Sequence, residues 1–521
     1  MKTKQLLLTG FLLLFALSIS AGVTILPNDP NIQYIGRFNK TNPLAPTITW
    51  TGDAIKINFQ GTSLQVKISS WTAIKYYVTI DGVTNFFTFT NNSGSSYTYT
   101  LCSGLTDGNH SATIFKRNNP EQPQTFYGFI LDDGKTLLPP PDRKIRKIEF
   151  YGDSQTLGAQ VEVPGLGPDI SSGYDNNYYS YDAITARALN AEYTCVAKNG
   201  ATLTTKSTNN IPSVYDRVGS DTSNPLWDFS WIGDVVCVNL GVNDDYTLPA
   251  DFTSTYITFV QRIRTNNPNA YIFLLAGPLG TSSTLKNAIK ATVTTMNTAG
   301  DSKVYYYAFT TQITHSGHPR TAENVACAKE LVAQIKSVIW SETIPNLSVE
   351  DTYITPIPIP LNVGSTEQLN STVTPFDAID KVVSWTSSNE AVLKVNSTGL
   401  VTAIGGGTAN ITATSHDGNK SFTVSITVSG PSGLLTPKKE DNMIQLYPNP
   451  LTGRILNINS TEVTGEKYLS IFDVTGKMVF SKKLQNSDSQ AVNLNSINLK
   501  GSYIAKISND KFSKSQLLII Q

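Results

Sequence analysis

Between residues 147 and 340, short apolar segments alternate with helical patterns, and this alternation constrains the fold more than any other feature. Each apolar segment has the length of a buried strand, and the pattern after the last one repeats every three or four residues, as on one helix face. Such alternation predicts a doubly wound parallel sheet with helices on both faces. We expect strands at 147–151, 192–196, 234–240, 271–276 and 304–308, and a helix lined by Val325, Ala328, Val332, Ile335 and Ile339.

The segments on either side of this α/β region have a different period. From about Tyr34 to Leu138, apolar and polar residues alternate, and turn signals such as Asp81-Gly82 interrupt them. Alternation with frequent turns predicts a β-sandwich of the jelly-roll type. Three prolines at 139–141 then form a stiff linker, and the chain becomes rich in predicted strands again after Trp340.

The N-terminus has the features of a signal peptide. Lys2 and Lys4 precede an apolar stretch at 6–19, and the small residues Ser20 and Ala21 follow it. The stretch is shorter than the ~18 to 20 apolar residues that a membrane-spanning helix needs, so we expect export and a mature chain without a transmembrane segment. A chain of 521 residues requires several domains. We expect a signal peptide at 1–21, a jelly-roll β-sandwich at 22–140, a three-layer α/β domain at 141–342, and β-sandwiches at 343–430 and 431–521.

Charge and cysteine content exclude several kinds of partner. The formal net charge is zero, charged residues make up 15% of the chain, and no basic cluster stands out, so we expect no nucleic-acid partner. The four cysteines show neither a disulfide framework nor the spacing of a zinc site. We therefore interpret the cysteines as structural and expect no metal and no cofactor.

Candidate catalytic residues follow the predicted strands, and ligands of such sheets gather at the carboxyl ends of the strands. Ser154 ends the turn Gly152-Asp153-Ser154, Gly200 follows the second strand, and Asn243 follows the third. A serine hydroxyl becomes a good nucleophile only when a base accepts its proton, and a neutral imidazole suits that task. Of the four histidines, His315 and His318 alone lie in the α/β region.

Taken in order, these segments resemble the conserved blocks of SGNH, or GDSL-like, hydrolases. The resemblance assigns the nucleophile to Ser154 and the general base to His318, which precedes Pro319. It also implies an oxyanion hole formed by the backbone N–H groups of Ser154 and Gly200 with the Asn243 amide. Taken singly, Asn243 could equally cap a helix and Gly200 could simply turn the chain.

One position departs from the pattern of these hydrolases. Where the family has an aspartate three residues before the catalytic histidine, this sequence has His315. We therefore expect another group to orient the imidazole of His318. A backbone carbonyl of His315 or Ser316 is our hypothesis, and an aspartate from elsewhere in the chain is the alternative.

Three segments are similar to carbohydrate esterase family 2: Arg146 to Ser154, Pro225 to Phe229 with Trp231, and Asp234 to Asp244. The resemblance implies an acetylxylan esterase-like enzyme that removes O-acetyl groups from plant polysaccharides such as xylan or glucomannan, in some members with a Ser-His dyad. Trp231, Tyr246 and Tyr174 are candidates for stacking on sugar rings, although each could equally be a packing residue.

Two alternative hypotheses for the function remain open at this point. One is a GDSL-type lipase or a deacylase of another glycan, which a comparison of acetyl and long-chain esters would distinguish. The other is a noncatalytic glycan-binding surface adhesin. In that case the wild type would hydrolyse no ester, or Ser154→Ala would leave ester hydrolysis unchanged.

The last two regions resemble known modules. Ser384–Asn389, Gly399–Ala403 and Gly405–Asn410 are similar to the group 2 bacterial immunoglobulin-like (Ig-like) domain, a spacer or adhesion unit. Leu446–Pro450, Ile471–Lys477 and Gly501–Ile507 are similar to the type IX secretion C-terminal sorting domain. This resemblance implies the type IX secretion machinery as a partner, and a protein secreted or attached to the surface of a Gram-negative bacterium.

Overall fold

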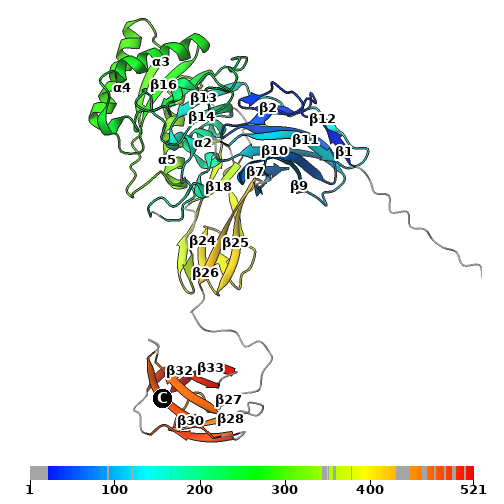
Figure 1. The fold of residues 1–521 in the computed structure, drawn as a ribbon, viewed down its shortest axis with the longest axis vertical. Coiled ribbons are helices and arrows are strands. Elements are labelled where there is room, and N and C mark those ends of the chain that lie inside the picture. The colour runs from blue at the N-terminus through cyan, green and yellow to red at the C-terminus, as the bar shows by residue number, and fades with distance from the viewer. Residues whose placement is uncertain are drawn as a thin grey trace, which may run out of the picture. The chain divides into compact units, whose positions relative to one another are not determined.

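The computed structural model describes residues 22–429 and 445–521, apart from short segments at 91–92, 119–121, 166, 343–348, 350, 356–359, 377, 379, 460–465, 474–476, 486–488, 496–499 and 510–511. The expected signal peptide at 1–21 and the middle of the 471–477 motif lie outside the described residues. The chain forms two compact units, with the division after Pro431 (Figure 1). Among the residues described, no helix is long and apolar enough to cross a membrane.

The N-terminal region is a sandwich of two antiparallel sheets. Alternate side chains of its strands, such as Ile55 and Ile57 on one sheet and Val66 and Ile68 on the other, are buried in a shared apolar core. One sheet contains β1 (Val23–Ile25), β3 (Phe38–Asn39), β4 (Thr47–Ile48), β6 (Leu64–Ser69), β9 (Ser96–Cys102) and β11 (Gln124–Leu131). The other contains β2 (Gln33–Ile35), β5 (Ala54–Gly61), β7 (Ile74–Ile80), β8 (Val83–Phe89), β10 (Gly108–Lys116) and β12 (Leu137–Leu138).

The next region is a five-stranded parallel sheet in the order β14-β13-β15-β16-β17. Its strands are β13 (Arg146–Gly152), β14 (Ala191–Ala197), β15 (Val235–Asn239), β16 (Tyr271–Ala276) and β17 (Val304–Ala308). Its helices are α1 (Ser154–Leu157), α2 (Tyr181–Ala188), α3 (Phe252–Asn266), α4 (Ser283–Thr298) and α5 (Thr321–Lys336), with 3₁₀ turns η1 (Ser172–Tyr174), η2 (Asn177–Tyr179), η3 (Ile211–Ser213) and η4 (Asp245–Thr247).

Both faces of this sheet are covered. Phe150 of β13 packs in a cluster with α2 and α5, whereas its neighbour Tyr151 packs in a cluster with α3 and α4. Side chains on a strand alternate between faces, so an apolar residue at nearly every position fills both layers. The predicted helix differs in one respect: α5 ends at Lys336, and Ile339 packs against the core from beyond its end.

Arg37 of the sandwich is buried against the parallel sheet of the α/β region. Its Nη2 donates to the hydroxyl of Tyr151 (2.7 Å), which donates to Oε2 of Glu149 (2.6 Å). Burial raises the pKa of Glu149, and the positive charge of Arg37 opposes that rise. A buried charge needs a partner, so this network joins the sandwich to the α/β region.

A third β region follows the α/β region within the same compact unit. Its strands are β18 (Asp351–Thr355), β19 (Leu361–Asn362), β20 (Thr366–Gln368), β21 (Asn370–Thr374), β22 (Val383–Ser387), β23 (Leu393–Val395), β24 (Leu400–Ala403), β25 (Gly407–Ser415) and β26 (Ser421–Ser429). Arg187 of α2 lies 3.4 Å from the carboxylate of Asp351 and donates to the hydroxyl of Tyr353. In addition, Ser421 of β26 pairs with Val83 of β8, so one sheet continues from the first sandwich into this region.

Among its described residues, the C-terminal unit contains strands and no helix. Its two sheets enclose an apolar core that includes Leu456, Leu469 and Ile507. The smaller sheet contains β27 (Gln445–Tyr447), β28 (Ile455–Asn459) and β31 (Ser489–Asn493), and the larger contains β29 (Lys467–Phe472), β30 (Met478–Leu484), β32 (Gly501–Asn509) and β33 (Phe512–Ile520).

Candidate active site

Ser154 lies at the carboxyl end of the second strand in the sheet order, β13, as the first residue of the short helix α1. Asp153 caps this helix, because its side chain accepts a hydrogen bond from the N–H of Gln155. Gly158 ends the helix in the left-handed conformation (φ +83°), where a Cβ would lie 2.6 Å from the carbonyl oxygen of Asn176. The tight turn therefore depends on a capping side chain at Asp153 and on a glycine at position 158.

His318 lies in the loop before α5, and its Nε2 is 2.8 Å from the hydroxyl oxygen of Ser154. The two residues are 164 positions apart in sequence. Helix α5 begins at Thr321, so His318 is held near the start of a long, well-packed helix. The structure thus brings together the two residues that the sequence pattern singled out, at hydrogen-bonding distance.

The other ring nitrogen of His318 contacts Asp169, a residue that the sequence analysis did not identify. Nδ1 lies 2.6 Å from Oδ2 of Asp169, and the backbone N–H of His318 donates to Oδ1 (3.1 Å). This geometry differs from the hypothesis that a backbone carbonyl of His315 or Ser316 orients His318. It agrees with the alternative, an aspartate from elsewhere in the chain. The carboxylate arrives from a long loop between α1 and η1, where no fixed spacing marks it.

Arg320 holds the carboxylate of Asp169 in place. Its Nη1 donates to Oδ1 of Asp169 (2.9 Å), and its guanidinium also reaches the carbonyl oxygens of Gln160, Gly167 and His318. Partial burial acts to raise the pKa of Asp169, but the hydrogen bonds from His318 and Arg320 outweigh it and lower the pKa. Asp169 is therefore ionised at neutral pH.

Gly317 makes room for this acid. It adopts φ +106°, and a Cβ at this position would lie 2.3 Å from Oδ1 of Asp169. Any side chain here would displace the carboxylate and would also strain the backbone. Position 317 therefore requires a glycine for steric reasons, which the sequence pattern did not show.

His315 has a structural environment. Its Nε2 lies 3.0 Å from Oε2 of Glu323, in the first turn of α5, and its Nδ1 lies 3.0 Å from the carbonyl oxygen of Ser316. The same oxygen of Glu323 accepts the backbone N–H of Arg320 (2.8 Å). His315 therefore fixes the start of α5, and with it the position of His318.

Gly200 and Asn243 follow β14 and β15, the two strands that flank β13. Nδ2 of Asn243 donates to the carbonyl oxygen of Ala201 (2.9 Å), which leaves its second amide hydrogen available. Within the described part of the chain, no group accepts a hydrogen bond from the N–H of Gly200. The N–H of Gly200 and the amide of Asn243 can therefore each donate a hydrogen bond at the edge of the sheet where Ser154 lies.

The three aromatic candidates lie in different places. Trp231 donates from its indole N–H to Glu192 (3.3 Å), near the amino end of β14, so it lies at the opposite edge of the sheet from Ser154. Trp231 follows the segment Pro225 to Phe229 in the sequence, but by this point the chain has returned to the edge of the sheet where β15 begins. Tyr246 is 97% exposed in η4, close after Asn243. Tyr174 lies in η1, on the loop that carries Asp169.

Three family models match the chain. The carbohydrate esterase 2 N-terminal model matches residues 34–141, the group 2 bacterial Ig-like model matches 348–426, and the secretion system C-terminal sorting model matches 445–521. The sorting domain indicates type IX secretion, and hence a protein that is secreted or held at the cell surface.

Similar proteins include carbohydrate esterases. The cellulase/esterase CelE of Acetivibrio thermocellus is 35% identical over 60% of this chain, which spans 40% of the length of that relative. An acetylxylan esterase / glucomannan deacetylase of Cellvibrio japonicus is 27% identical over 64% of this chain and 98% of its own length. Among solved structures, a family two carbohydrate esterase from Clostridium thermocellum in complex with cellohexaose is 32% identical, with a TM-score of 0.54, over 59% of this chain and 98% of that one.

Proposed function

Because the chain belongs to carbohydrate esterase family 2, we propose that it removes O-acetyl groups from plant polysaccharides, xylan or glucomannan, through an acyl-enzyme on Ser154. The observation that carries this proposal is the line of contacts from Ser154 through His318 to Asp169, with distances of 2.8 and 2.6 Å. This arrangement supplies a nucleophile, a base and a group that orients the base.

The proposed reaction has two halves. In the first, Nε2 of His318 accepts the proton of Ser154 while the serine oxygen attacks the acetyl carbonyl carbon. The tetrahedral intermediate expels the sugar oxygen, which takes the proton from His318 and leaves as a hydroxyl. In the second half, water attacks acetyl-Ser154 with His318 again as base. Acetate leaves, and the serine hydroxyl is restored.

Asp169 is the proposed orienting acid. An ionised carboxylate accepts a hydrogen bond, so its contact with Nδ1 of His318 requires that nitrogen to carry the proton. Nε2 then has its lone pair free toward Ser154. The carboxylate also stabilises the imidazolium that forms when His318 accepts the serine proton.

The proposed oxyanion hole consists of the N–H groups of Ser154 and Gly200 and the amide of Asn243. Negative charge develops on the carbonyl oxygen during attack, and donors already in place stabilise it without reorganisation. The bond from Asn243 to Ala201 fixes the amide plane, and the carboxylate of Asp244 accepts from the N–H groups of Leu203 and Thr204 beside it. These contacts join the loops after β14 and β15.

Acetate release tests this proposal. We expect the wild type to release acetate from acetylated xylan or acetylated glucomannan, and Ser154→Ala to abolish that release while leaving the thermal unfolding temperature almost unchanged. Acetylated pectin serves as a comparison substrate. The proposal fails if the wild type releases no acetate from either polysaccharide, or if Ser154→Ala retains the activity.

A further inference from the structure

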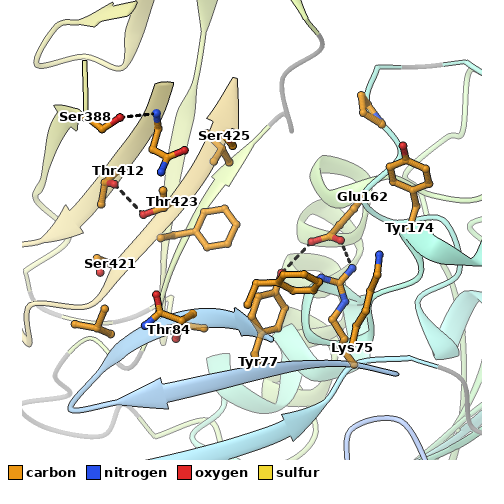
Figure 2. Close-up of a pocket in the computed structure, with 18 of the residues that line it drawn as sticks. Lys75, Tyr77, Thr84, Glu162, Tyr174, Ser388, Thr412, Ser421, Thr423 and Ser425 are labelled. Atoms are coloured by element: carbon orange, nitrogen blue, oxygen red, sulfur yellow. Dashed lines mark hydrogen bonds and ion pairs between the residues drawn. The ribbon is translucent and has the colours of Figure 1, made fainter. Parts of the chain in front are cut away.

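A groove with a volume of about 920 Å³ lies between the first sandwich, the α/β region and the Ig-like region (Figure 2). Its size is at the upper end of the range for ligand sites. Neither Ser154 nor His318 lines it, so it is distinct from the candidate active site. Glu162, Pro164, Gly173 and Tyr174 do line it, and these residues flank the loop segment that carries Asp169.

The walls of this groove are fixed to one another. Strand β26 of the Ig-like region pairs with β8 of the first sandwich at Ser421 and Val83. The ring of Phe422 packs edge-on against that of Tyr179, with centroids 5.1 Å apart. Together with the contacts of Arg187 to Asp351 and Tyr353, these interactions hold the Ig-like region against the α/β region.

The wall formed by the Ig-like region offers uncharged polar groups. Thr412, Thr423, Ser388 and Ser425 face Lys75, Tyr77 and Glu162 across the gap in Figure 2. Thr412 and Thr423 share a hydrogen bond of 2.8 Å, and both also have capacity for another partner. Hydroxyl groups in such a row suit a ligand that is itself covered with hydroxyl groups.

The charged residues of the opposite wall already have hydrogen-bond partners. Glu162 forms an ion pair with Arg117 and accepts a hydrogen bond from Tyr77 (2.9 Å), while the ammonium of Lys75 donates to the carbonyl oxygen of Gly173. Beside them, Phe86 lines the groove and is 51% exposed, and the guanidinium of Arg117 lies 5.1 Å from the centroid of its ring. A half-exposed aromatic ring on one wall and neutral hydroxyl groups on the other fit a sugar chain, which has both apolar faces and hydroxyl groups.

We infer that this groove, defined by the residues above, binds a neutral stretch of polysaccharide chain next to the segment that is deacetylated. The inference rests on the proposed function for the class of ligand. The Ig-like region would then act as one side of a substrate-binding groove, and the polymer would contact it while an acetylated unit lies at Ser154.

Affinity gel electrophoresis with soluble glucomannan and with xylan tests the inference on the full chain carrying Ser154→Ala. In that background we compare Phe86→Ala, which removes the exposed ring, with Thr423→Arg, which fills the groove. Thr427→Arg is the matched control, because Thr427 is exposed on the same strand, forms the same kind of Thr-Thr bond with Thr408 (3.2 Å), and does not line the groove.

We expect at least one of the two polymers to retard the parent protein, and both groove variants to raise the apparent Kd about tenfold, or ~1.4 kcal/mol, with Thr427→Arg unchanged. No retardation, equal retardation of all variants, or an equal loss with Thr427→Arg would overturn the groove assignment. Acetate release by the wild type is measured separately, so a failure of the esterase proposal is distinguished from a failure of this one.

Discussion

The carboxylate of Asp169 lies 2.6 Å from Nδ1 of His318, although the two residues are 149 positions apart in sequence. This contact determines which ring nitrogen carries the proton, and so directs the free lone pair of Nε2 to Ser154. Arg320 and the backbone N–H of His318 contact the other oxygen of the same carboxylate. The orientation of the base therefore depends on a loop that is remote in sequence.

Asp169→Asn should lower kcat for p-nitrophenyl acetate on the order of a thousandfold or more. The amide keeps the shape of the side chain but can donate to Nδ1, which favours the wrong tautomer of His318. Asp133→Asn, at an exposed position, is the control and should retain full activity. A loss smaller than about tenfold at Asp169 would show that the carboxylate does not orient the base.

Gly317→Ala should also lower kcat, by about tenfold or more, because its Cβ would lie 2.3 Å from Oδ1 of Asp169. Gly300→Ala is a matched control. That glycine also has a positive φ (+101°), but no atom lies within 4 Å of the added Cβ. Both variants carry backbone strain of about 1 kcal/mol, and only the first disturbs the acid. Equal kcat values for the two variants would contradict this reasoning.

Asn243→Ala should reduce kcat about a hundredfold or more with little change in KM, since an oxyanion-hole donor acts mainly in the transition state. Steady-state kinetics with p-nitrophenyl acetate gives both constants. A rise in KM with an unaltered kcat would instead indicate that Asn243 only binds the ground state.

The stability of the first unit should depend on pH through Asp153, whose pKa is raised by burial to about 6, against the opposing hydrogen bonds from Gln155. Between its ordinary pKa of 3.8 and about 6, the folded state binds the proton more tightly than the unfolded state does. Its contribution to the free energy of unfolding is therefore complete at low pH and is lost as the pH rises through this window.

Asp153→Asn removes this dependence and keeps an oxygen to cap α1. Relative to wild type, the variant should gain up to about 3 kcal/mol between pH 4 and pH 7. Denaturant unfolding followed by tryptophan fluorescence measures it, because all six tryptophans precede residue 432. A constant difference between the two proteins across this pH range would refute the prediction.

The strand ends of the α/β region could be predicted from sequence because local patterns encode them. Apolar runs mark the strands, and Ser154, Gly200 and Asn243 follow those runs directly, so the parallel arrangement places them at one edge. His318 could be placed because a strong helical pattern follows it. In each case a short segment specified both the element and the position of the side chain.

Asp169 and Trp231 show why the rest could not be predicted. Asp169 reaches the site through a loop whose path depends on contacts with Gln160 and Arg320, one of them 151 positions away. Trp231 lies between two site segments in sequence, but the chain there runs back to the amino edge of the sheet. Loop paths depend on tertiary contacts, which local periodicity does not record.

The burial of Arg37 beneath Glu149 and Tyr151 has a consequence for how the chain folds. During synthesis the first sandwich leaves the ribosome before residue 149 is added, so at that stage the guanidinium of Arg37 lacks the carboxylate of Glu149 and has Asp53 of the same sandwich as its nearby acid. The burial of Arg37 against Tyr151 and Glu149 therefore waits for the sheet that follows. A fragment cut at the proline linker would separate Arg37 from Glu149, so each half should be less stable alone than within the whole chain.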